Sequence, residues 1–248
     1  MANITIWNEF LHEQANDACG ETCRKHYPQG IHAYLKQALE PTMKDCTFRA
    51  VSLDMPENGL PDSVLNDTDV LVWWGHMAHD QVPDALVDRI QHRVLGGMGL
   101  VVLHSGHMSK IFRRMLGTPC TLRWREIGEK ERVWTCDPAH PITHDVPETF
   151  AIEQTEMYGE PFGIPDDAHV VFMSWYAGGN VFRSGVTLQR GLGRIFYFAP
   201  GHETLPIYHN PSVQSVIANG IRWCVPANGV GPAPNCPHER EPLEPVNK

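Results

Sequence analysis

The sequence predicts an α/β protein built on a doubly wound, mostly parallel sheet, with added antiparallel strands in its second half. Two observations support this fold class. Short apolar strands alternate with helical segments over the first 116 residues, which is typical of parallel sheets with helices on both faces. Later strand-like segments are joined by short connections, which favour antiparallel pairing.

The first half supplies four strands and three helices. The apolar runs DVLVWW (69–74) and LVVL (100–103) are continuous, as expected for strands covered on both faces. Helical spacing marks DQVPDALVDRIQHRVLGG (80–97), which ends at a Gly-Gly pair. The remaining predicted elements are strands at 3–7 and 46–53 and helices at 31–39 and 109–116.

The second half contains strand-like segments and one final helix. Asn210 followed by Pro211 predicts a helix start, because Asn caps helices well and Pro suits their first position. The strand-like segments are TLRW (121–124), RVWT (132–135), HVVFMSWY (169–176), GNVFRSGVT (179–187) and GRIFYFA (193–199). We expect one domain over residues 1–226 and a Pro-rich tail over 227–248.

Composition excludes several classes of function. The net charge is −9, from 20 Lys and Arg against 29 Asp and Glu, so binding to nucleic acid or to acidic membranes is disfavoured. The start of the chain lacks the features of a signal peptide, and no apolar run is long enough to cross a bilayer. The seven scattered cysteines do not form a disulfide framework, which favours a reduced, cytoplasmic protein. Cys19 and Cys23 are spaced like a metal or redox pair, but ordinary reduced thiols are the simpler interpretation.

Histidine and glutamate follow four of the predicted strands. Ligands of an open parallel sheet bind beyond the carboxyl ends of its strands, so these side chains are expected to meet in one crevice. The residues concerned are Glu9 and His12, His76 and His79, His104 and His107, and His202 and Glu203. Trp7, Trp73 and Trp74 flank the same edge and could form a platform for sugar rings, although Trp73 and Trp74 must point to opposite faces of their strand.

Several long blocks of the chain resemble the trehalose-utilisation (ThuA-like) proteins. These include WNEFLHE, DVLVWWGHMAHDQVP, GMGLVVLHSGHMSKIF, EQTEMYGEPFGIP and RIFYFAPGHETLPIYHN, and they extend to about Pro226. The resemblance implies the class I glutamine-amidotransferase-like superfamily, a flavodoxin-like core and a role in disaccharide catabolism. It also implies that His104 stands where amidotransferases carry their nucleophilic Cys and that His202 resembles their catalytic His. Without a thiol at that corner, glutaminase chemistry is excluded.

A serine nucleophile at the same corner is disfavoured. The elbow pattern G-x-S-x-G would need glycine at positions 103 and 107, where this chain has Leu103 and His107 around Ser105.

Two mechanisms remain open. In one, His12, His104, Glu156 and His202 hold a divalent metal, with Zn²⁺ the best match to imidazole and carboxylate ligands. In the other, His104 with His202 or Glu156 acts as an acid/base pair on a sugar or keto-sugar, without metal. His12 joins these three as the fourth predicted catalytic residue, and no nucleotide cofactor is expected. The predicted substrate-binding residues are Glu9, His76, His79, His107, Tyr158 and Glu203.

The segment EQTEMYGEPF, which carries Glu156 and Tyr158, is equally consistent with an acidic loop that closes over the crevice or contacts a second subunit. The partner expected is a small-molecule sugar, with homo-oligomerisation possible through the antiparallel strands. The rival hypothesis is a non-catalytic sugar-binding or regulatory protein that kept the amidotransferase scaffold.

Overall fold

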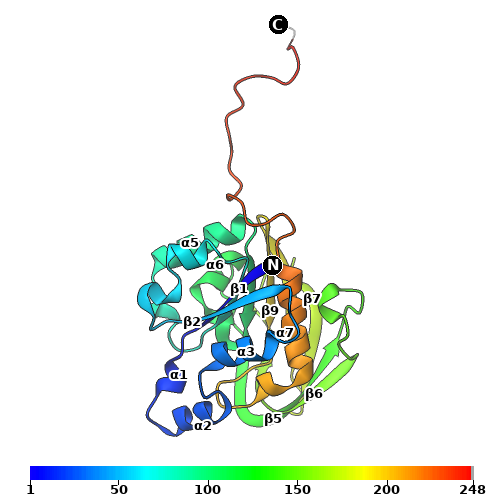
Figure 1. The fold of residues 1–248 in the computed structure, drawn as a ribbon. Coiled ribbons are helices and arrows are strands. Elements are labelled where there is room, and N and C mark those ends of the chain that lie inside the picture. Colours follow the sequence, from blue (N-terminus) through cyan, green and yellow to red (C-terminus); the bar gives the residue numbers. More distant parts are fainter. Residues whose placement is uncertain (247–248) are drawn as a thin grey trace.

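The computed structural model describes residues 1–246 and contains one mixed sheet of nine strands within that range (Figure 1). The strand order is β2-β1-β3-β4-β9-β8-β7-β5-β6. The strands are β1 (Ala2–Asn8), β2 (Cys46–Ser52), β3 (Val70–Trp74), β4 (Gly99–Leu103), β5 (Arg123–Thr135), β6 (Thr149–Gly159), β7 (His169–Tyr176), β8 (Val181–Arg190) and β9 (Gly193–Phe198).

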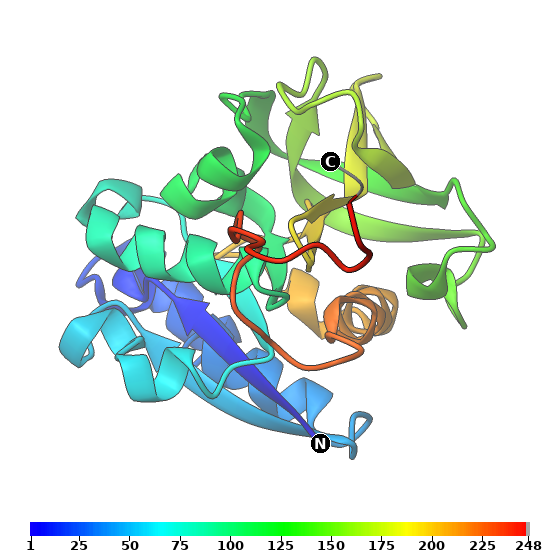
Figure 2. The ribbon, with the colours of Figure 1, turned by 90° about the horizontal axis from the view of Figure 1, so that it is seen from above.

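Helices cover both faces of the sheet. They are α1 (Leu11–Gln14), α2 (Ala18–His26), α3 (Ile31–Leu39), α4 (Asp62–Leu65), α5 (Asp84–Leu95), α6 (Lys110–Leu116) and α7 (Pro211–Cys224). The apolar sides of α5 and α6 pack into one core cluster and those of α3 and α7 into the other. Figure 2 shows α5 and α7 on opposite sides of the sheet. The predicted doubly wound arrangement is confirmed.

The parallel part of the sheet is β2-β1-β3-β4-β9. Its four strand pairs are all parallel, and the strand order is that of flavodoxin-like sheets. In such sheets β2 is added on one side of β1 and the later strands on the other, so the order of addition reverses between β1 and β3. Because neighbouring strands share a direction, the carboxyl ends of β1, β3, β4 and β9 lie side by side. The predicted helices at 31–39 and 109–116 are present with shifts of at most one residue, as α3 and α6.

The antiparallel part is an insertion between α6 and β9. Strands β5, β6, β7 and β8 pair antiparallel and extend the sheet beyond β9. Two predictions here are wrong in detail. TLRW and RVWT belong mostly to one strand, β5, whose polar middle contains register shifts and Gly128 at φ 72°, so its alternation is interrupted. EQTEMYG, up to Gly159, is part of strand β6 and not a loop.

The segment after β1 also differs from expectation. The sequence predicts no helix between the strand at 3–7 and the helix at 31–39, but α1 and α2 form there, and α2 is capped by Asp17, whose side chain accepts a hydrogen bond from the Gly20 N–H. Its mostly polar sequence shows little apolar periodicity, so the pattern gave no helix signal. Helix α5 begins at Asp84, four residues later than predicted, because a separate 3₁₀ turn (His79–Gln81) and Pro83 precede it.

The three tryptophans near the strand ends belong to the core. Trp7 and Trp73 stack on each other with ring centroids 3.8 Å apart, and Trp74 packs in the cluster on the other face. All three side chains are at most 1% exposed, so the predicted sugar platform from these residues is wrong. Alternation along β3 does place Trp73 and Trp74 on opposite faces, as expected.

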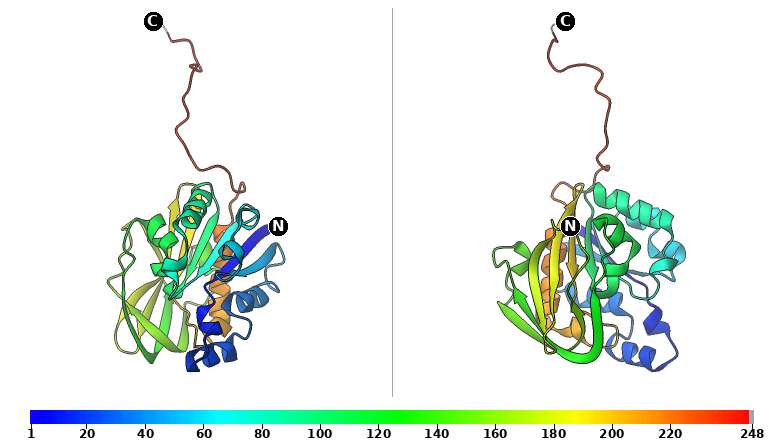
Figure 3. Two further views of the ribbon diagram at one scale, coloured as in Figure 1. Left: turned by 90° about the vertical axis from the view of Figure 1, so that its left-hand side faces the viewer. Right: turned by 180° about the vertical axis from the view of Figure 1, so that it is seen from behind.

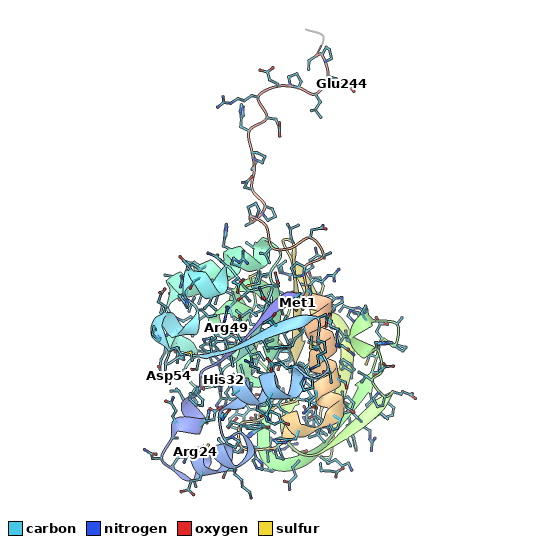
Figure 4. The ribbon with its side chains drawn as sticks, in the orientation of Figure 1. Met1, Arg24, His32, Arg49, Asp54 and Glu244 are labelled. Atoms are coloured by element: carbon cyan, nitrogen blue, oxygen red, sulfur yellow. The ribbon has the colours of Figure 1, made fainter. Side chains whose placement is uncertain are left out.

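After α7 the chain has no helix or strand as far as residue 246, the last residue described, and it projects from the body (Figure 3). The start of this tail is attached to the core by a hydrogen bond from the Gly231 N–H to the Gly96 carbonyl. Glu244 marks its outer part in Figure 4. Across residues 1–246, no helix is both long and apolar enough to span a membrane.

The contribution of the Asn210 cap of helix α7 to stability can be measured by mutation. Its side-chain oxygen accepts hydrogen bonds from the N–H groups of Ser212 and Val213, and its amide donates to the Ala151 carbonyl. We expect Asn210→Ala to lower the free energy of unfolding by about 1 kcal/mol in denaturant titrations, since a helix cap is lost. Asn210→Asp keeps the capping oxygen and should recover most of the loss. Ser212 lies two residues further on, in the first turn of α7. If Ser212→Ala lowers the free energy of unfolding as much as Asn210→Ala does, the capping explanation is wrong.

Candidate functional site at the strand ends

Four adjacent strand ends deliver the predicted side chains to one edge of the sheet. Glu9 and His12 follow β1, and His76 and His79 follow β3. His104 and His107 follow β4, and His202 and Glu203 follow β9. Ring centroids of His12 and His76 lie 4.9 Å apart, and those of His104 and His202 lie 5.7 Å apart. The predicted convergence is therefore present.

His104 occupies a strained corner at the end of β4. Its φ of 49° is in the left-handed region, which costs a non-glycine residue roughly 1–2 kcal/mol. Its carbonyl accepts a hydrogen bond from the Tyr197 hydroxyl at 3.0 Å, and its Nδ1 lies 3.0 Å from the Ala199 carbonyl. Gly201 allows the β9 loop to approach, since a Cβ there would lie 2.9 Å from that of His104. These contacts hold the ring in one orientation.

His104 forms a buried ion pair with Glu156. The His104 Nε2 lies 3.2 Å from the Glu156 Oε2, and the Tyr158 hydroxyl lies 3.4 Å from the same nitrogen. The Tyr158 ring stacks on the imidazole at 4.8 Å, with the planes 4° apart. Because the Ala199 carbonyl can only accept, Nδ1 carries a proton, and Nε2 is the atom that faces Glu156. Strand β6 supplies both Glu156 and Tyr158 to this contact.

The pair favours its charged form. Burial alone would lower the pKa of His104, but the hydrogen bond and charge of Glu156 outweigh burial, and the pKa of His104 is raised. Burial alone would raise the pKa of Glu156, but the hydrogen bond and charge of His104 outweigh it, and the pKa of Glu156 is lowered. The pair is therefore an imidazolium beside a carboxylate.

Two neighbouring histidines are neutral instead. Burial lowers the pKa of His202 to about 4, and burial likewise lowers the pKa of His107 to about 4. The Nδ1 of His202 accepts a hydrogen bond from the Thr204 N–H at 3.1 Å, which places the proton of the neutral ring on Nε2. In His107 the pattern is reversed, because Nδ1 donates to the Cys120 carbonyl at 2.7 Å. His202 thus offers a hydrogen-bond donor at Nε2, and His107 offers an acceptor at Nε2.

Glu9 has a positioning role. Its carboxylate accepts hydrogen bonds from the N–H groups of His76, Met77 and Ala78 at 2.6, 2.8 and 3.0 Å, so it fixes the turn after β3. It is 1% exposed and does not line the pocket described next. Its contact with substrate stays a prediction.

A pocket of about 510 Å³ opens beside the ion pair. Among the predicted site residues, His76, His79, His107, Glu156, Tyr158, His202 and Glu203 line it. Its other lining residues, which sequence reasoning did not assign to the site, are Ser105, Met108, Thr121, Leu122, Trp124 and Glu126. Leu122, Trp124 and Glu126 are two residues apart, and this strand alternation was the signal that could have found them. His12 and His104 are absent from the lining and lie in the layer beneath.

Metal-ligand geometry divides the predicted metal set. Among the described residues, three groups have ligand atoms within 4.8 Å of one another, namely Glu9–His12–His76, His12–Cys19–Glu203 and His104–His202–Glu203. His12 and His104 fall in different groups, and Glu156 is in none of these three. The four-residue set of His12, His104, Glu156 and His202 thus stays a prediction, and His12 and Glu203 are each shared by two of the groups.

A parallel core in flavodoxin order, an antiparallel insertion and a positive-φ corner after β4 define this protein as glutamine-amidotransferase-like in fold. Within that class, the chain belongs to the ThuA (trehalose utilisation) family, whose model matches residues 3–224. His104 is at the corner after β4, and its equivalence to the nucleophilic Cys of amidotransferases stays a prediction from the resemblance.

Solved structures support the fold assignment. A ThuA-like protein from Parabacteroides merdae is 16% identical, with a TM-score of 0.67 over 92% of this chain and 91% of that one. A cytoplasmic protein from Salmonella typhimurium is 14% identical, with a TM-score of 0.60 over 90% and 99%. A glutamine amidotransferase from Thermotoga maritima is 11% identical, with a TM-score of 0.52 over 90% and 98%. No curated protein matches the sequence significantly.

The ion pair gives a prediction for NMR titration of the histidines. In Glu156→Gln the charge of Glu156 is removed and burial remains, so the pKa of His104 should fall below the ordinary value of about 6.5. The raised pKa of His104 means that its stabilising contribution is lost as pH rises through that pKa. The lowered pKa of Glu156 means that its contribution is lost as pH falls through that pKa. The difference in unfolding free energy between wild type and Glu156→Gln should therefore be largest between about pH 4.3 and 6.5.

Glu153→Gln is the matched control. Glu153 lies on the same strand but is exposed and pairs with Lys130, so this change should leave the pKa of His104 where it is. An unchanged His104 titration in Glu156→Gln would contradict the ion pair.

Proposed function

We propose that this protein is an enzyme of disaccharide utilisation that moves a proton at a carbon next to the carbonyl of a keto-sugar. The observation that carries the proposal is the buried His104–Glu156 ion pair at the pocket, with the ring of neutral His202 5.7 Å from that of His104. Membership of the trehalose-utilisation family supports a sugar as substrate.

Glu156 is the candidate base. It lines the pocket, and its lowered pKa keeps it ionised at neutral pH, which is the form that accepts a proton. His104 is buried beneath the pocket, so it acts as a positioning residue that orients the Glu156 carboxylate. Tyr158, stacked on His104, fixes that ring in turn.

His202 is the candidate electrophile. Because its ring is neutral and its Nδ1 accepts from the Thr204 N–H, the proton of His202 is on Nε2. This N–H lies 3.4 Å from the exposed carboxylate of Glu126, and a substrate carbonyl oxygen that displaces Glu126 would accept its hydrogen bond. In the step proposed, the C–H bond breaks and its proton goes to Glu156. The C–H electron pair forms the C=C bond of an enolate, and the π pair of the carbonyl moves to its oxygen, where the His202 N–H stabilises the developing charge. A glutamate base with a neutral histidine donor is an established pairing for such enolisation.

The hydrogen bonds at this pair favour proton transfer over a metal held by His104 and His202. The Nε2 of His104 already contacts Glu156, and Nε2 of neutral His202 carries a proton. Either nitrogen would have to lose its present contact or proton before it could bind a cation. The His104–His202–Glu203 group therefore fits a metal poorly in its present hydrogen-bonded state.

The pocket also suits a sugar in shape and polarity. Its volume lies within the usual range for small-molecule sites. Trp124 at its rim is 66% exposed and offers the apolar ring face on which the C–H face of a sugar packs, the role first expected of the buried tryptophans. The cytoplasmic description of the Salmonella protein supports the same compartment for this chain.

The test is exchange of the acidic proton. A keto-disaccharide incubated with the enzyme in D₂O should incorporate deuterium next to its carbonyl, measured by NMR. Glu156→Gln and His202→Ala should slow the exchange about 10²–10⁴-fold each, as expected for loss of a proton-transfer group. His169→Ala, an exposed histidine paired with Asp137, should have no effect.

A wild-type protein that binds the sugar and never exchanges this proton would be a binding protein, and the proposal would be wrong. If exchange occurs, the acidic limb of its pH profile should lie below about 4.3, the ordinary value for glutamate, because the pKa of Glu156 is lowered.

A further inference from the structure

Cys19 lies beside the site although the sequence favoured an ordinary thiol. It is in the first turn of α2, and its Sγ is within 4.8 Å of ligand atoms of His12 and Glu203. Helix α2 is held against α1 by Arg24, whose guanidinium donates to the carbonyls of Glu13 and Ala15 at 2.7 and 2.8 Å (Figure 4 labels Arg24 on α2). The placement of Cys19 is therefore fixed by the fold.

Two polar atoms here are buried without a partner among the described residues. They are the Oε2 of Glu203 and the Nδ1 of His12. Both residues are more than nine-tenths buried, at 7% and 5% exposure. A buried carboxylate oxygen without a hydrogen bond is costly, typically by about 1–3 kcal/mol, so the Oε2 of Glu203 lacks a partner within the cluster. The Nδ1 of His12 is on the side of the ring that faces Glu9, and its Nε2 is the nitrogen that faces Glu203.

The spacing of the cluster suits a cation better than a hydrogen bond. The Nε2 of His12 and the Oε1 of Glu203 are 3.8 Å apart, too far for a hydrogen bond. Nitrogen and oxygen ligands on a tetrahedral Zn²⁺ are roughly 3.3–3.5 Å apart, given metal–ligand bonds of about 2.0–2.2 Å. A small shift of either side chain would bring both onto one ion.

A carboxylate lies behind the ring of His12, although at a distance too long for a hydrogen bond. Its Nδ1 lies 3.7 Å from the Oε1 of Glu9, and a carboxylate behind a histidine commonly orients its other nitrogen toward a metal. The Nε2 of His12 also lies 3.2 Å from the Nδ1 of His76. That contact must open when an ion binds, which leaves His76, at the wall of the pocket, next to the fourth coordination position.

We propose that His12, Cys19 and Glu203 form a divalent-cation site, with Zn²⁺ the ion that this nitrogen, sulfur and oxygen set suits best. The thiol of Cys19 loses its proton to solvent on binding, and the resulting thiolate, the imidazole and the carboxylate are the three protein ligands. The fourth position is open toward His76 and the pocket. This site adjoins the proton-transfer residues, since Glu203 also has a ligand atom within 4.8 Å of those of His104 and His202, but none of its three ligands is His104, Glu156 or His202.

The test uses Co²⁺ as a spectroscopic substitute on the full chain after chelator treatment. Binding to Cys19 should produce a thiolate-to-cobalt charge-transfer band in the near ultraviolet at one ion per chain, and Zn²⁺ should displace it. Cys19→Ser should abolish the band and weaken Zn²⁺ binding by at least the roughly 10–100-fold that loss of an outer-shell partner costs. Cys23→Ser is the matched control, since its Sγ lies one helical turn away and 4.0 Å from that of Cys19, and it should keep the band.

A second measurement covers the case of a variant that folds poorly. Zn²⁺ should protect Cys19 of the wild-type protein from alkylation, measured by mass spectrometry, while Cys236, exposed in the tail, stays reactive. His104→Ala should keep both the band and the protection, which separates this site from the proton-transfer pair. The proposal is overturned if saturating Co²⁺ gives no charge-transfer band in wild type, or if the band survives in Cys19→Ser.

Discussion

The parallel alignment of β1, β3, β4 and β9 is the constraint on which the site depends. Each of these strands is buried among its neighbours, so its end is fixed to within the spacing of the hydrogen-bonded sheet. Histidine and glutamate placed just after the strands therefore meet without any long-range signal in the sequence. The strained φ of His104 is tolerated because the sheet and the Tyr197 and Ala199 contacts determine its position from several sides.

The parallel core could be predicted because its signals are local. Val70–Trp74 and Gly99–Leu103 are uninterrupted apolar runs, and Asn210–Pro211 marks the start of α7 in the sequence itself. The antiparallel insertion was harder, since the register shifts of β5 are set by pairing with β6, which no local pattern reveals. In the same way, α2 is stabilised by its Asp17 cap and by Arg24 more than by an apolar stripe.

In the candidate site, too, some residues could be predicted from local sequence signals and others depend on tertiary packing. Strand ends identified His76, His79, His107, His202 and Glu203 as neighbours, and the acidic segment EQTEMYGEPF supplied Glu156 as a candidate. What could not be read from the chain was the depth of each side chain. His104 and Glu9 are beneath the pocket, where they orient groups that face it, whereas Trp124 and Glu126 reach the pocket from a strand whose direction depends on tertiary pairing. How deeply a side chain is buried depends on the residues that pack against it, and these are distant in the sequence.

The origin of the pocket walls has an evolutionary consequence. The other lining residues come from the parallel core, while Thr121, Leu122, Trp124, Glu126, Glu156 and Tyr158 come from the segment inserted between α6 and β9 or its entry. Substitutions or length changes in that segment can reshape the rim without moving the strand ends beneath. A scaffold divided in this way can acquire new substrates by remodelling one insertion while the corner at His104 stays as it is.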